Sequence, residues 1–495
     1  MSVMNKRTVT FLTLIVLFTL ALRLIFAFTT PNLTYDSYFH VKQVEHVTQT
    51  GQPLFNDPLS FGGKEVRFLP FFHYLMALFN LILPIAILTK LIPNILLATL
   101  PILTFLIAKQ LTNNDNASLV ASLVTALLPI LFITNTFTPL TLVFPLAFLA
   151  IYSFLKIKET KYLYTYLVSF IILSFTSSTT FLILMGFGIY LLLSVLERKK
   201  IKKSEIELIL FSVFFFLWAQ FIFFKDAFLK EGVGFIWQNI PTEFIIDYLP
   251  KPTIPEALVA VSIIPFIAGV YIVYRSLFSS HNQKAFLLIS LVVSTTLLSW
   301  AGLIEFQSAL IFVGLIISIL FAFFFQDWQQ FLQKTRFAKK KKLFSIILVI
   351  VLIASMIPSL ISTATAQTTP SEEDMATFVW LKDHTPKDAT IVALLEEGHL
   401  ITYVSQKKNV MDNQFHFIDN INERFLDITA VYTTQFQTDV LQIFDKYQAD
   451  YLVVTPLAKE KFNLENIPYI SRDCFTKIYN EGTWVYLVRC ELTEQ

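Results

Sequence analysis

Most of the chain consists of long apolar runs separated by short polar loops. The first run covers residues 8–28, and about 20 consecutive apolar residues suffice to cross the hydrocarbon core of a bilayer. Because polarity does not alternate within the runs, they predict membrane-spanning helices rather than the strands of a barrel. We expect about eleven spans, at residues 8–28, 85–108, 117–134, 139–156, 162–176, 178–196, 206–224, 256–278, 285–300, 304–325 and 343–362.

One shorter apolar segment, at residues 71–83, decides the predicted topology. It ends before Pro84 and is short for a crossing, so we interpret it as an interfacial or re-entrant helix. Basic residues gather in the loops at 156–161, 197–203 and 334–342, and basic loops favour the cytoplasmic side. These loops share that side with the N-terminus only if the short segment does not cross.

This topology divides the chain after the last span. Residues 1–362 form a predicted transmembrane domain, with external loops at 29–84 and 225–255. Residues 363–495 form a predicted extracytoplasmic domain. We therefore expect a multi-pass protein of the plasma membrane, with its N-terminus in the cytoplasm and its C-terminal domain outside.

Composition agrees with a membrane protein. The 495 residues are 55% hydrophobic and 15% charged, with a mean hydropathy of +0.62, whereas about 25% of a soluble domain is charged. A net charge of +2 gives no reason to expect a nucleic-acid partner. The two cysteines form neither a CxxC motif nor a Cys/His zinc pattern.

The C-terminal region has the pattern of a small α/β layer. A helix begins after a capping serine, Ser371, with acidic residues in its first turn. The last two strands form a predicted hairpin that brings Cys474 close to Cys490, either as a disulfide or as two thiols. The other predicted elements are strands at 390–395, 408–411 and 451–454 and helices at 421–434 and 437–447.

The first external loop carries the strongest candidate chemistry. Asp36 and His40 are four residues apart, so they share one face of a helix. Together they could bind a divalent cation such as Mg²⁺ or Mn²⁺, or they could form a polar patch or a helix cap at the membrane surface. Lys64 and Arg67 in the same loop could bind a lipid phosphate or anchor the loop at the interface. Arg23, near the outer end of the first span, could snorkel or pair with Asp36 or a lipid phosphate.

Several segments resemble one family of membrane enzymes. These are Asp36–His40 followed by Leu69–Leu75, then Met375–Pro386, Val410–Asn413 and Ala449–Val454. They resemble the GT-C superfamily of glycosyltransferases, specifically the catalytic subunit of archaeal oligosaccharyltransferases. The resemblance implies a polytopic α-helical membrane domain with a C-terminal soluble α/β domain. It also implies a sugar donor linked to a polyprenyl phosphate such as dolichyl phosphate, and a protein or glycan acceptor at the outer face.

The same resemblance implies roles for individual residues. Asp36 matches the family's acidic position that binds the metal or activates the acceptor. Glu243 lies where the family places the glutamate of a catalytic loop. Glu396, Glu397 and His399 lie at the family's acceptor-binding motif; without that role, they would form a solvated turn after a strand.

The chain also departs from the family pattern. Its second external loop, Asn135–Pro139, lacks the family's acidic pair, and Leu394–Gly398 lacks the two tryptophans of the acceptor motif. An arginine of a late span corresponds here to Glu305 or Gln307. We therefore expect an oligosaccharyltransferase-like enzyme, with three alternatives left open. These are a transferase that takes a monosaccharide from a polyprenyl monophosphate, a non-catalytic relative that binds the lipid carrier, and a transporter.

Overall fold

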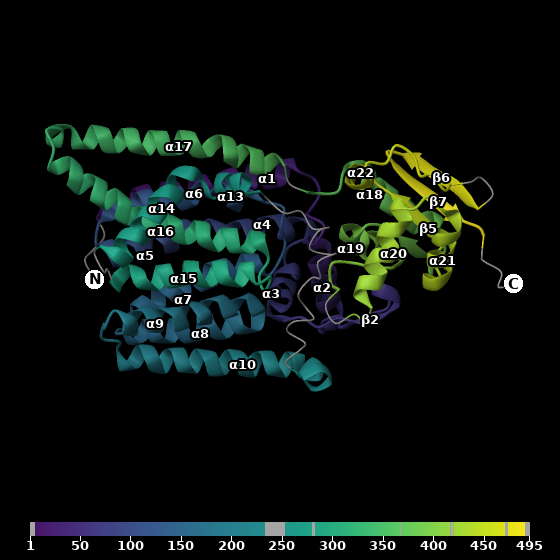
Figure 1. Cartoon of the computed structure of the whole chain (residues 1–495), viewed down its shortest axis with the longest axis horizontal. Coiled ribbons are helices and arrows are strands. Elements are labelled where there is room, and N and C mark those ends of the chain that lie inside the picture. The colour runs from purple at the N-terminus through teal and green to yellow at the C-terminus, as the bar shows by residue number, and fades with distance from the viewer. Residues whose placement is uncertain are drawn as a thin grey trace.

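A bundle of long helices forms one end of the molecule and a smaller α/β region forms the other (Figure 1). This computed structural model describes residues 5–232, 253–279, 283–366, 368–415, 418, 420–470 and 474–490. The N-terminus lies at the end of the bundle far from the α/β region (Figure 1). The expected fold class, a polytopic helical membrane protein with a C-terminal α/β region, is confirmed.

The bundle is built from helices of unequal length, and two shorter helices, α2 and α3, lie near its junction with the α/β region (Figure 1). Their bounds are α1 Lys6–Thr29, α2 Ser37–Thr50, α3 Phe71–Asn80, α4 Ile85–Ala98, α5 Leu100–Thr112, α6 Asp115–Ala126, α7 Leu140–Leu155, α8 Thr160–Thr176, α9 Phe181–Leu196, α10 Lys203–Glu231, α13 Ile254–Val261, α14 Ile263–Phe278, α15 Gln283–Trp300, α16 Phe306–Gln333 and α17 Lys341–Thr365. Short 3₁₀ turns cover Pro129–Phe132, Ser178–Thr180 and Ala338–Lys340.

Six helical segments of the described chain are long and apolar enough to cross a membrane, so the chain is a multi-pass membrane protein. The number becomes seven if the bent pair α13–α14 counts as one span. Two shorter apolar helices, Leu140–Leu155 and Ala285–Trp300, add to the bundle. The count of eleven spans is not confirmed, because helices fall in all the expected places but several of them are short or broken.

Proline and backbone geometry explain two of these breaks. The expected span at 85–108 lies within one candidate span, Ile85–Thr112, in which a single turn at Thr99 separates α4 from α5 just before Pro101. The expected span at 256–278 is divided into α13 and α14, which meet at 91°. Ser262 at that corner has a φ of 75°, and Pro265 follows within the first turn of α14. A left-handed residue and a residue without an N–H group both end a regular helix.

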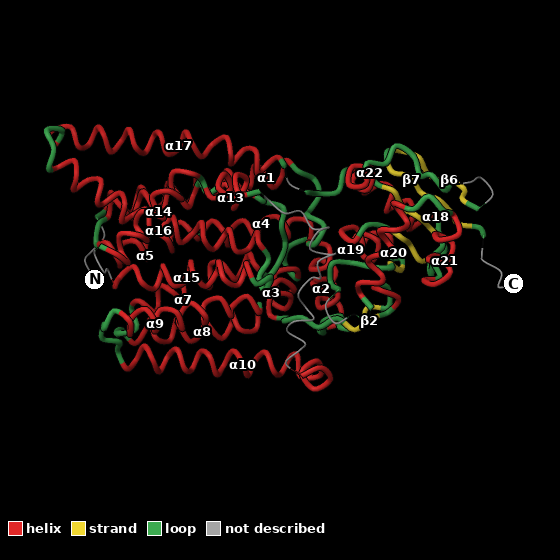
Figure 2. Tube along the Cα trace, in the orientation of Figure 1, coloured by secondary structure: helices red, strands yellow, loops and turns green. Residues whose placement is uncertain are grey.

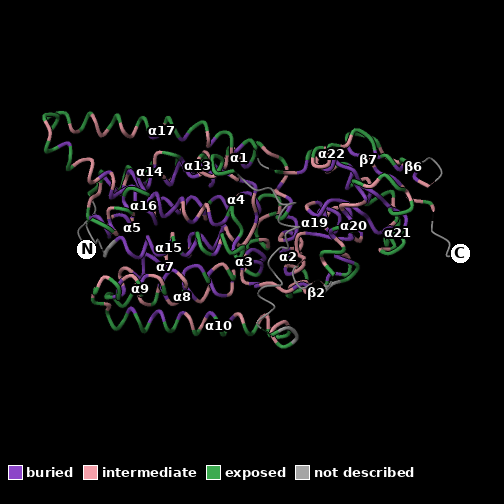
Figure 3. Tube along the Cα trace, viewed as in Figure 1, coloured by how far each residue is buried: buried purple, intermediate pink, exposed green. Residues whose placement is uncertain are grey.

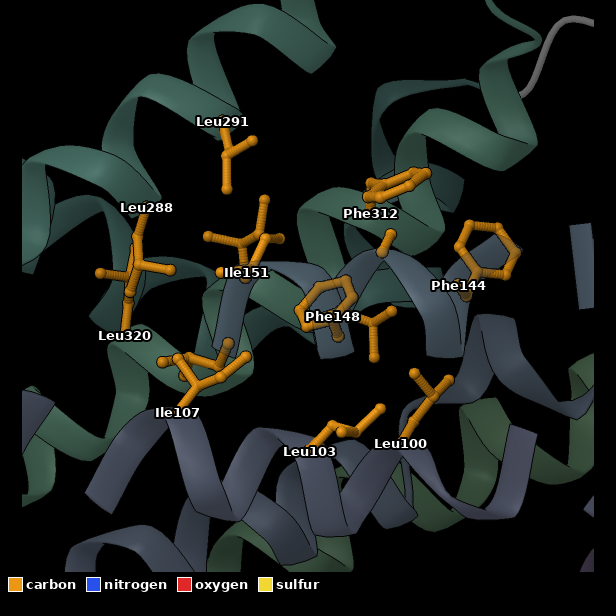
Figure 4. Packing of buried hydrophobic residues seen from close by; sticks show 14 of the residues in the cluster. Leu100, Leu103, Ile107, Phe144, Phe148, Ile151, Leu288, Leu291, Phe312 and Leu320 are labelled. Carbon is orange, nitrogen blue, oxygen red and sulfur yellow. The ribbon is translucent and has the colours of Figure 1, made fainter. Parts of the chain in front are cut away.

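The bundle has one apolar core. Phe144 and Phe148 of α7 contact Phe312 of α16, with ring centroids 5.1 Å and 6.2 Å apart. Leu100 and Ile107 of α5 point toward them (Figure 4). Outside this core the apolar side chains of α1, α10 and α17 are largely exposed (Figure 3), as expected of helices that face lipid.

Arg23 differs from its predicted role. Its side chain is fully buried, and its guanidinium donates to the carbonyl of Leu131 and lies 5.7 Å from the ring centroid of Phe132. It therefore neither reaches the membrane surface nor pairs with Asp36. The physical reason is that the 3₁₀ turn after α6 leaves carbonyl groups without helical partners, and a buried cation beside them satisfies one.

The α/β region contains a mixed sheet of five strands in the order β4-β3-β5-β7-β6 (Figure 2). The first three strands pair in parallel, whereas β7 is antiparallel to both of its neighbours. Cys474 and Cys490 are joined by a disulfide at the open end of the β6–β7 hairpin. The elements are α18 Glu372–His384, β3 Thr390–Val392, η6 Leu395–Glu397, α19 Gly398–Leu400, η7 Ile401–Ser405, β4 Lys408–Asn409, α20 Ile421–Thr433, α21 Gln437–Tyr447, β5 Tyr451–Val454, α22 Pro456–Phe462, β6 Phe475–Glu481 and β7 Thr483–Val488.

Residues 29–84, predicted as the first external loop and named so below, are packed into the α/β region. Tyr38 of α2 shares one apolar cluster with Phe378 and Leu381 of α18. Further along the loop, β1 (Asn56–Asp57), a 3₁₀ turn (η1, Ser60–Gly62) and β2 (Lys64–Glu65) form a small hairpin. Phe61 of that turn lies in a buried apolar cluster of the α/β region that also contains Val410 and Phe425. Buried contacts therefore join the two ends of the molecule.

Candidate functional site

Asp36 lies at the start of α2, where the bundle meets the α/β region. The turn that carries it is fixed by the second external loop. The Thr34 N–H donates to the Asn135 carbonyl at 3.1 Å, and the Phe137 N–H donates to the Ser37 hydroxyl at 2.9 Å. The position of Asp36 therefore depends on backbone contacts to the loop that lacks the family's acidic pair.

The Asp36 side chain is exposed, and its Oδ1 accepts a hydrogen bond from the side-chain amide of Asn413. Asn413 lies 377 positions further along the chain, directly after a buried carboxylate, Asp412. The segments Asp36–His40 and Val410–Asn413, which carry the family resemblance, thus meet in space.

A second carboxyl group lies within electrostatic reach of Asp36. Glu305 directly precedes α16, and its Oε2 accepts from the Ser308 hydroxyl at 3.0 Å. Glu305 is exposed as a residue, but the surrounding protein desolvates its carboxyl and so raises its pKa; the negative charge of Asp36 raises the pKa further. In the sequence alone, Glu305 stands out only as a departure from the family pattern. The sequence feature that could have identified Glu305 is a carboxylate at the end of a long apolar run.

His40 is held away from a chelating role with Asp36. Its Nδ1 lies 2.9 Å from Nε2 of His73, and the two rings stack with centroids 5.1 Å apart. Burial lowers the pKa of both imidazoles, that of His73 to about 3, so both are neutral. No group of three or more His, Cys, Asp or Glu residues in the described parts of the chain could hold a metal ion. An Asp36–His40 cation site does not fit this geometry.

The predicted phosphate-binding residues lie on the hairpin of the first external loop. The Arg67 guanidinium forms ion pairs with Asp226 at 3.1 Å and with Glu65. The backbone of Lys64 lies opposite that of Asp57 in the register of β1 and β2. Because carboxylates already contact Arg67, a lipid phosphate would have to displace them, and phosphate binding by either residue stays a prediction.

The three predicted acceptor-binding residues contact other parts of this chain. Glu397 is fully buried, accepts from the Thr455 hydroxyl and from the Leu394 N–H, and has its pKa raised by burial to about 8. Glu396 forms an ion pair with Lys461 at 2.7 Å. His399 is buried with its ring 5.3 Å from that of Phe39. Acceptor binding by these residues stays a prediction.

Glu243, the remaining predicted catalytic residue, lies outside the described residues. Among the described ones, the exposed Asp36 with its amide partner and the nearby Glu305 form the arrangement suited to proton transfer. An ionised carboxylate can accept a proton, and a neighbouring carboxyl of raised pKa gives up its own proton less readily. The two groups come from the N-terminal ends of α2 and α16.

No protein-family model and no curated protein sequence matches the chain. Solved structures match it closely in fold. The Archaeoglobus fulgidus oligosaccharyltransferase in its apo form has a TM-score of 0.68 at 13% sequence identity, over 92% of this chain and 70% of that chain. The same organism's archaeal oligosaccharyltransferase AglB, in complex with an inhibitory peptide and a dolichol-phosphate, has a TM-score of 0.67 at 12% identity, over 90% and 69%.

A bacterial enzyme shares the architecture as well. ArnT from Cupriavidus metallidurans in the apo state has a TM-score of 0.57 at 10% identity, over 95% of this chain and 97% of that chain. AglB and ArnT are both GT-C glycosyltransferases. The resemblance expected from the sequence is confirmed at the level of the fold, and the chain has the fold of the GT-C membrane glycosyltransferases.

Proposed function

We propose that the protein is a membrane glycosyltransferase that moves a sugar or oligosaccharide from a polyprenyl-phosphate carrier to an acceptor at the outer membrane face. The observation that carries this proposal is the position of Asp36. It is an exposed carboxylate on a fixed turn at the junction of bundle and α/β region. Neighbours of the same fold have been solved with dolichol-phosphate and with undecaprenyl phosphate, which supports a lipid phosphate carrier here.

In the proposed reaction Asp36 acts on the acceptor. The acceptor's nucleophilic atom forms a bond to the anomeric carbon of the sugar, and the bond from that carbon to the phosphate oxygen breaks. The acceptor proton passes to the Asp36 carboxylate, and the carrier leaves with the bonding electrons as its phosphate or pyrophosphate. The pKa of Glu305 is raised, so its carboxyl holds a proton more readily than an ordinary glutamate and adds less negative charge beside the leaving phosphate.

A divalent cation remains a separate question. A neighbour of this fold was solved with zinc and sulfate, and a cation at the leaving phosphate would offset its growing charge. The predicted pair of Asp36 and His40 does not fit such a site, because His40 pairs with His73. No step above depends on a cation, and transfer measured with Mg²⁺, with Mn²⁺ and with a chelator tests the requirement directly.

The topology belongs to the same proposal. We place residues 363–495 outside the cytoplasm, and the plasma membrane is the proposed location. The turn between α9 and α10 and the N-terminus lie at the end of the bundle opposite the α/β region (Figure 1). The basic residues of that turn and the positive-inside rule support a cytoplasmic location for it.

The test is transfer from lipid-linked sugars by the purified full-length protein. We expect Asp36→Asn to lower the turnover at least about 100-fold, since the amide keeps the shape but takes up no proton. Glu305→Gln should keep most of the activity, because Glu305 does not take up the acceptor proton in the proposed reaction. Full activity of Asp36→Asn would contradict the site assignment, and binding of the carrier without transfer would favour the non-catalytic alternative.

A second candidate function is monosaccharide transfer from a polyprenyl monophosphate. The absence of the two tryptophans from Leu394–Gly398 and the burial of Glu397, at the position of the acceptor motif, favour it. Monophosphate and pyrophosphate donors offered separately distinguish the two functions.

A further inference from the structure

The Asp36–Asn413 hydrogen bond joins two parts of the chain that otherwise belong to different ends of the molecule. The Asn413 side-chain amide donates to Oδ1 of Asp36. An ionised carboxylate can only accept hydrogen bonds, and an amide nitrogen can only donate them. The protein therefore binds one oxygen of Asp36, Oδ1, and the other oxygen, Oδ2, points in a fixed direction.

The segment that presents Asn413 is held on several sides. Its neighbour Asp412 is buried and accepts from the Ser60 hydroxyl, from the Asn409 side-chain amide at 3.2 Å and from the Gln414 N–H at 2.8 Å. Ser60 comes from the hairpin of the first external loop. Asn413 is thus fixed relative to the loop that carries Asp36, not only to its own α/β region.

Close packing at Gly398 also restrains the segment at residues 411–412, which precedes Asn413. A Cβ atom at Gly398 would lie 2.2 Å from the carbonyl oxygen of Met411 and 2.5 Å from Cβ of Asp412. No side chain fits there, so the backbone of residues 411–412 lies directly against α19. Asn409 adds a hydrogen bond to the Gly398 carbonyl at 3.0 Å. Little freedom remains for the segment to carry its amide away from Asp36.

We infer that Asn413 is a positioning residue for Asp36, and this inference rests on the proposed function. By binding Oδ1, the amide fixes the plane of the carboxylate and turns Oδ2 toward the acceptor. The contact also places a hydrogen-bond donor beside the Asp36 carboxylate. An ionised Glu305 would instead repel that carboxylate. Asn413 touches neither donor nor acceptor in this scheme, so it acts on the orientation of the base.

The experiment measures transfer by the full-length protein with Asn413 changed in three ways. Asn413→Ala removes the donor, Asn413→Asp keeps the shape but replaces the donor with a second acceptor, and Asn413→Gln keeps an amide. We expect kcat to fall about 10- to 100-fold in Asn413→Ala and further in Asn413→Asp, while KM for the lipid-linked donor stays unchanged. Asn413→Gln should recover part of the loss. Asn480→Ala, an exposed asparagine of the β6–β7 hairpin, serves as the matched control and should retain full activity.

A double-mutant cycle with Asp36→Asn separates positioning from a purely structural role. If Asn413 acts through Asp36, Asn413→Ala costs nothing further in residual activity once Asp36 is asparagine. Equal kcat in wild type and Asn413→Asp would overturn the inference, as would an undiminished loss in the Asp36→Asn background. Both results leave the proposed function standing if Asp36→Asn alone lowers the turnover at least about 100-fold. A wild-type protein that transfers no sugar from any lipid-linked donor overturns the proposed function and the inference together.

Discussion

Among single residues, Glu397 makes the sharpest prediction about stability. It is fully buried at the carboxyl ends of the parallel strands β3 and β5, and burial raises its pKa from 4.5 to about 8. Between these two pH values the folded protein holds a proton that the unfolded chain has lost. The free energy of unfolding therefore falls as pH rises through this window, and the full loss is reached above the folded pKa.

Glu397→Gln should remove this pH dependence. Glutamine resembles the protonated carboxyl and does not titrate, so at pH 8 the variant should be more stable than wild type by a few kcal/mol, on the order of the full shift. Thermal unfolding of the full-length protein across the pH window measures the slope. Glu396→Gln, at the neighbouring residue that pairs with Lys461, is the control and should keep the wild-type slope. An unchanged slope in Glu397→Gln would assign the pH dependence to other groups.

The sequence singled out Asp36 but not the residues around it. An acid four positions before a histidine, just after a long apolar run, is a visible local pattern. Its hydrogen bond with Asn413 and its electrostatic interaction with Glu305 join positions far apart in the chain, so they depend on how α16 and the α/β region pack against the loop. The pairing of His40 with His73 was missed for the same reason. Spacing along a helix places two residues on one face, but neighbours in space decide what they bind.

At the level of elements, the β6–β7 hairpin offers a direct test. Its strands are tied at their open end by the Cys474–Cys490 disulfide, which the sequence allowed but did not decide. A disulfide that closes a loop of this size restricts the unfolded chain and contributes about 3 kcal/mol to stability. The double variant Cys474→Ser and Cys490→Ser should therefore show faster hydrogen exchange in β6 and β7 and a lower unfolding temperature.

Reductant provides the control for that variant. Reduced wild type should lose the same stability as the double serine variant, and the variant should not respond to reductant. If reductant leaves the hairpin's exchange unchanged, the pairing with β5 rather than the disulfide holds β7 in place. Mass spectrometry with and without reductant establishes the bond itself.

The helices and strands also show which structural features the hydrophobic periodicity of the sequence does not predict. Strand β5 was predicted at its observed bounds, Tyr451–Val454, because a short apolar run between polar residues matches a buried strand. Hydrophobicity does not report a corner inside a membrane segment, and so α13 and α14 were expected as one span. The signals present were Pro265 and Ser262 near the start of α14, but proline alone does not distinguish a kinked helix from a corner of 91°.

For the whole molecule, the decisive property is orientation in the membrane. The N-terminus and the basic turn between α9 and α10 lie at one end of the bundle, and the α/β region lies at the other (Figure 1). Together with the positive-inside rule, this arrangement predicts that the region with Asn413 lies on the side opposite the cytoplasm. Under the proposed function, lipid-linked sugar, acceptor and Asp36 would meet on that outer side.

Cysteine labelling of intact cells tests this orientation. The disulfide between the two natural cysteines keeps the background low, so one exposed residue at a time can be changed to cysteine. We expect a membrane-impermeant maleimide to label Thr438→Cys of α21 in intact cells, and Lys200→Cys of the basic turn only after the membrane is permeabilised. Lys158→Cys, in the basic turn between α7 and α8, should behave like Lys200→Cys. Labelling of both ends in intact cells would mean that α3 or a broken helix crosses the membrane differently from the proposed topology. Labelling only at the basic turns would show that the orientation is the reverse, with the proposed reaction at the cytoplasmic face.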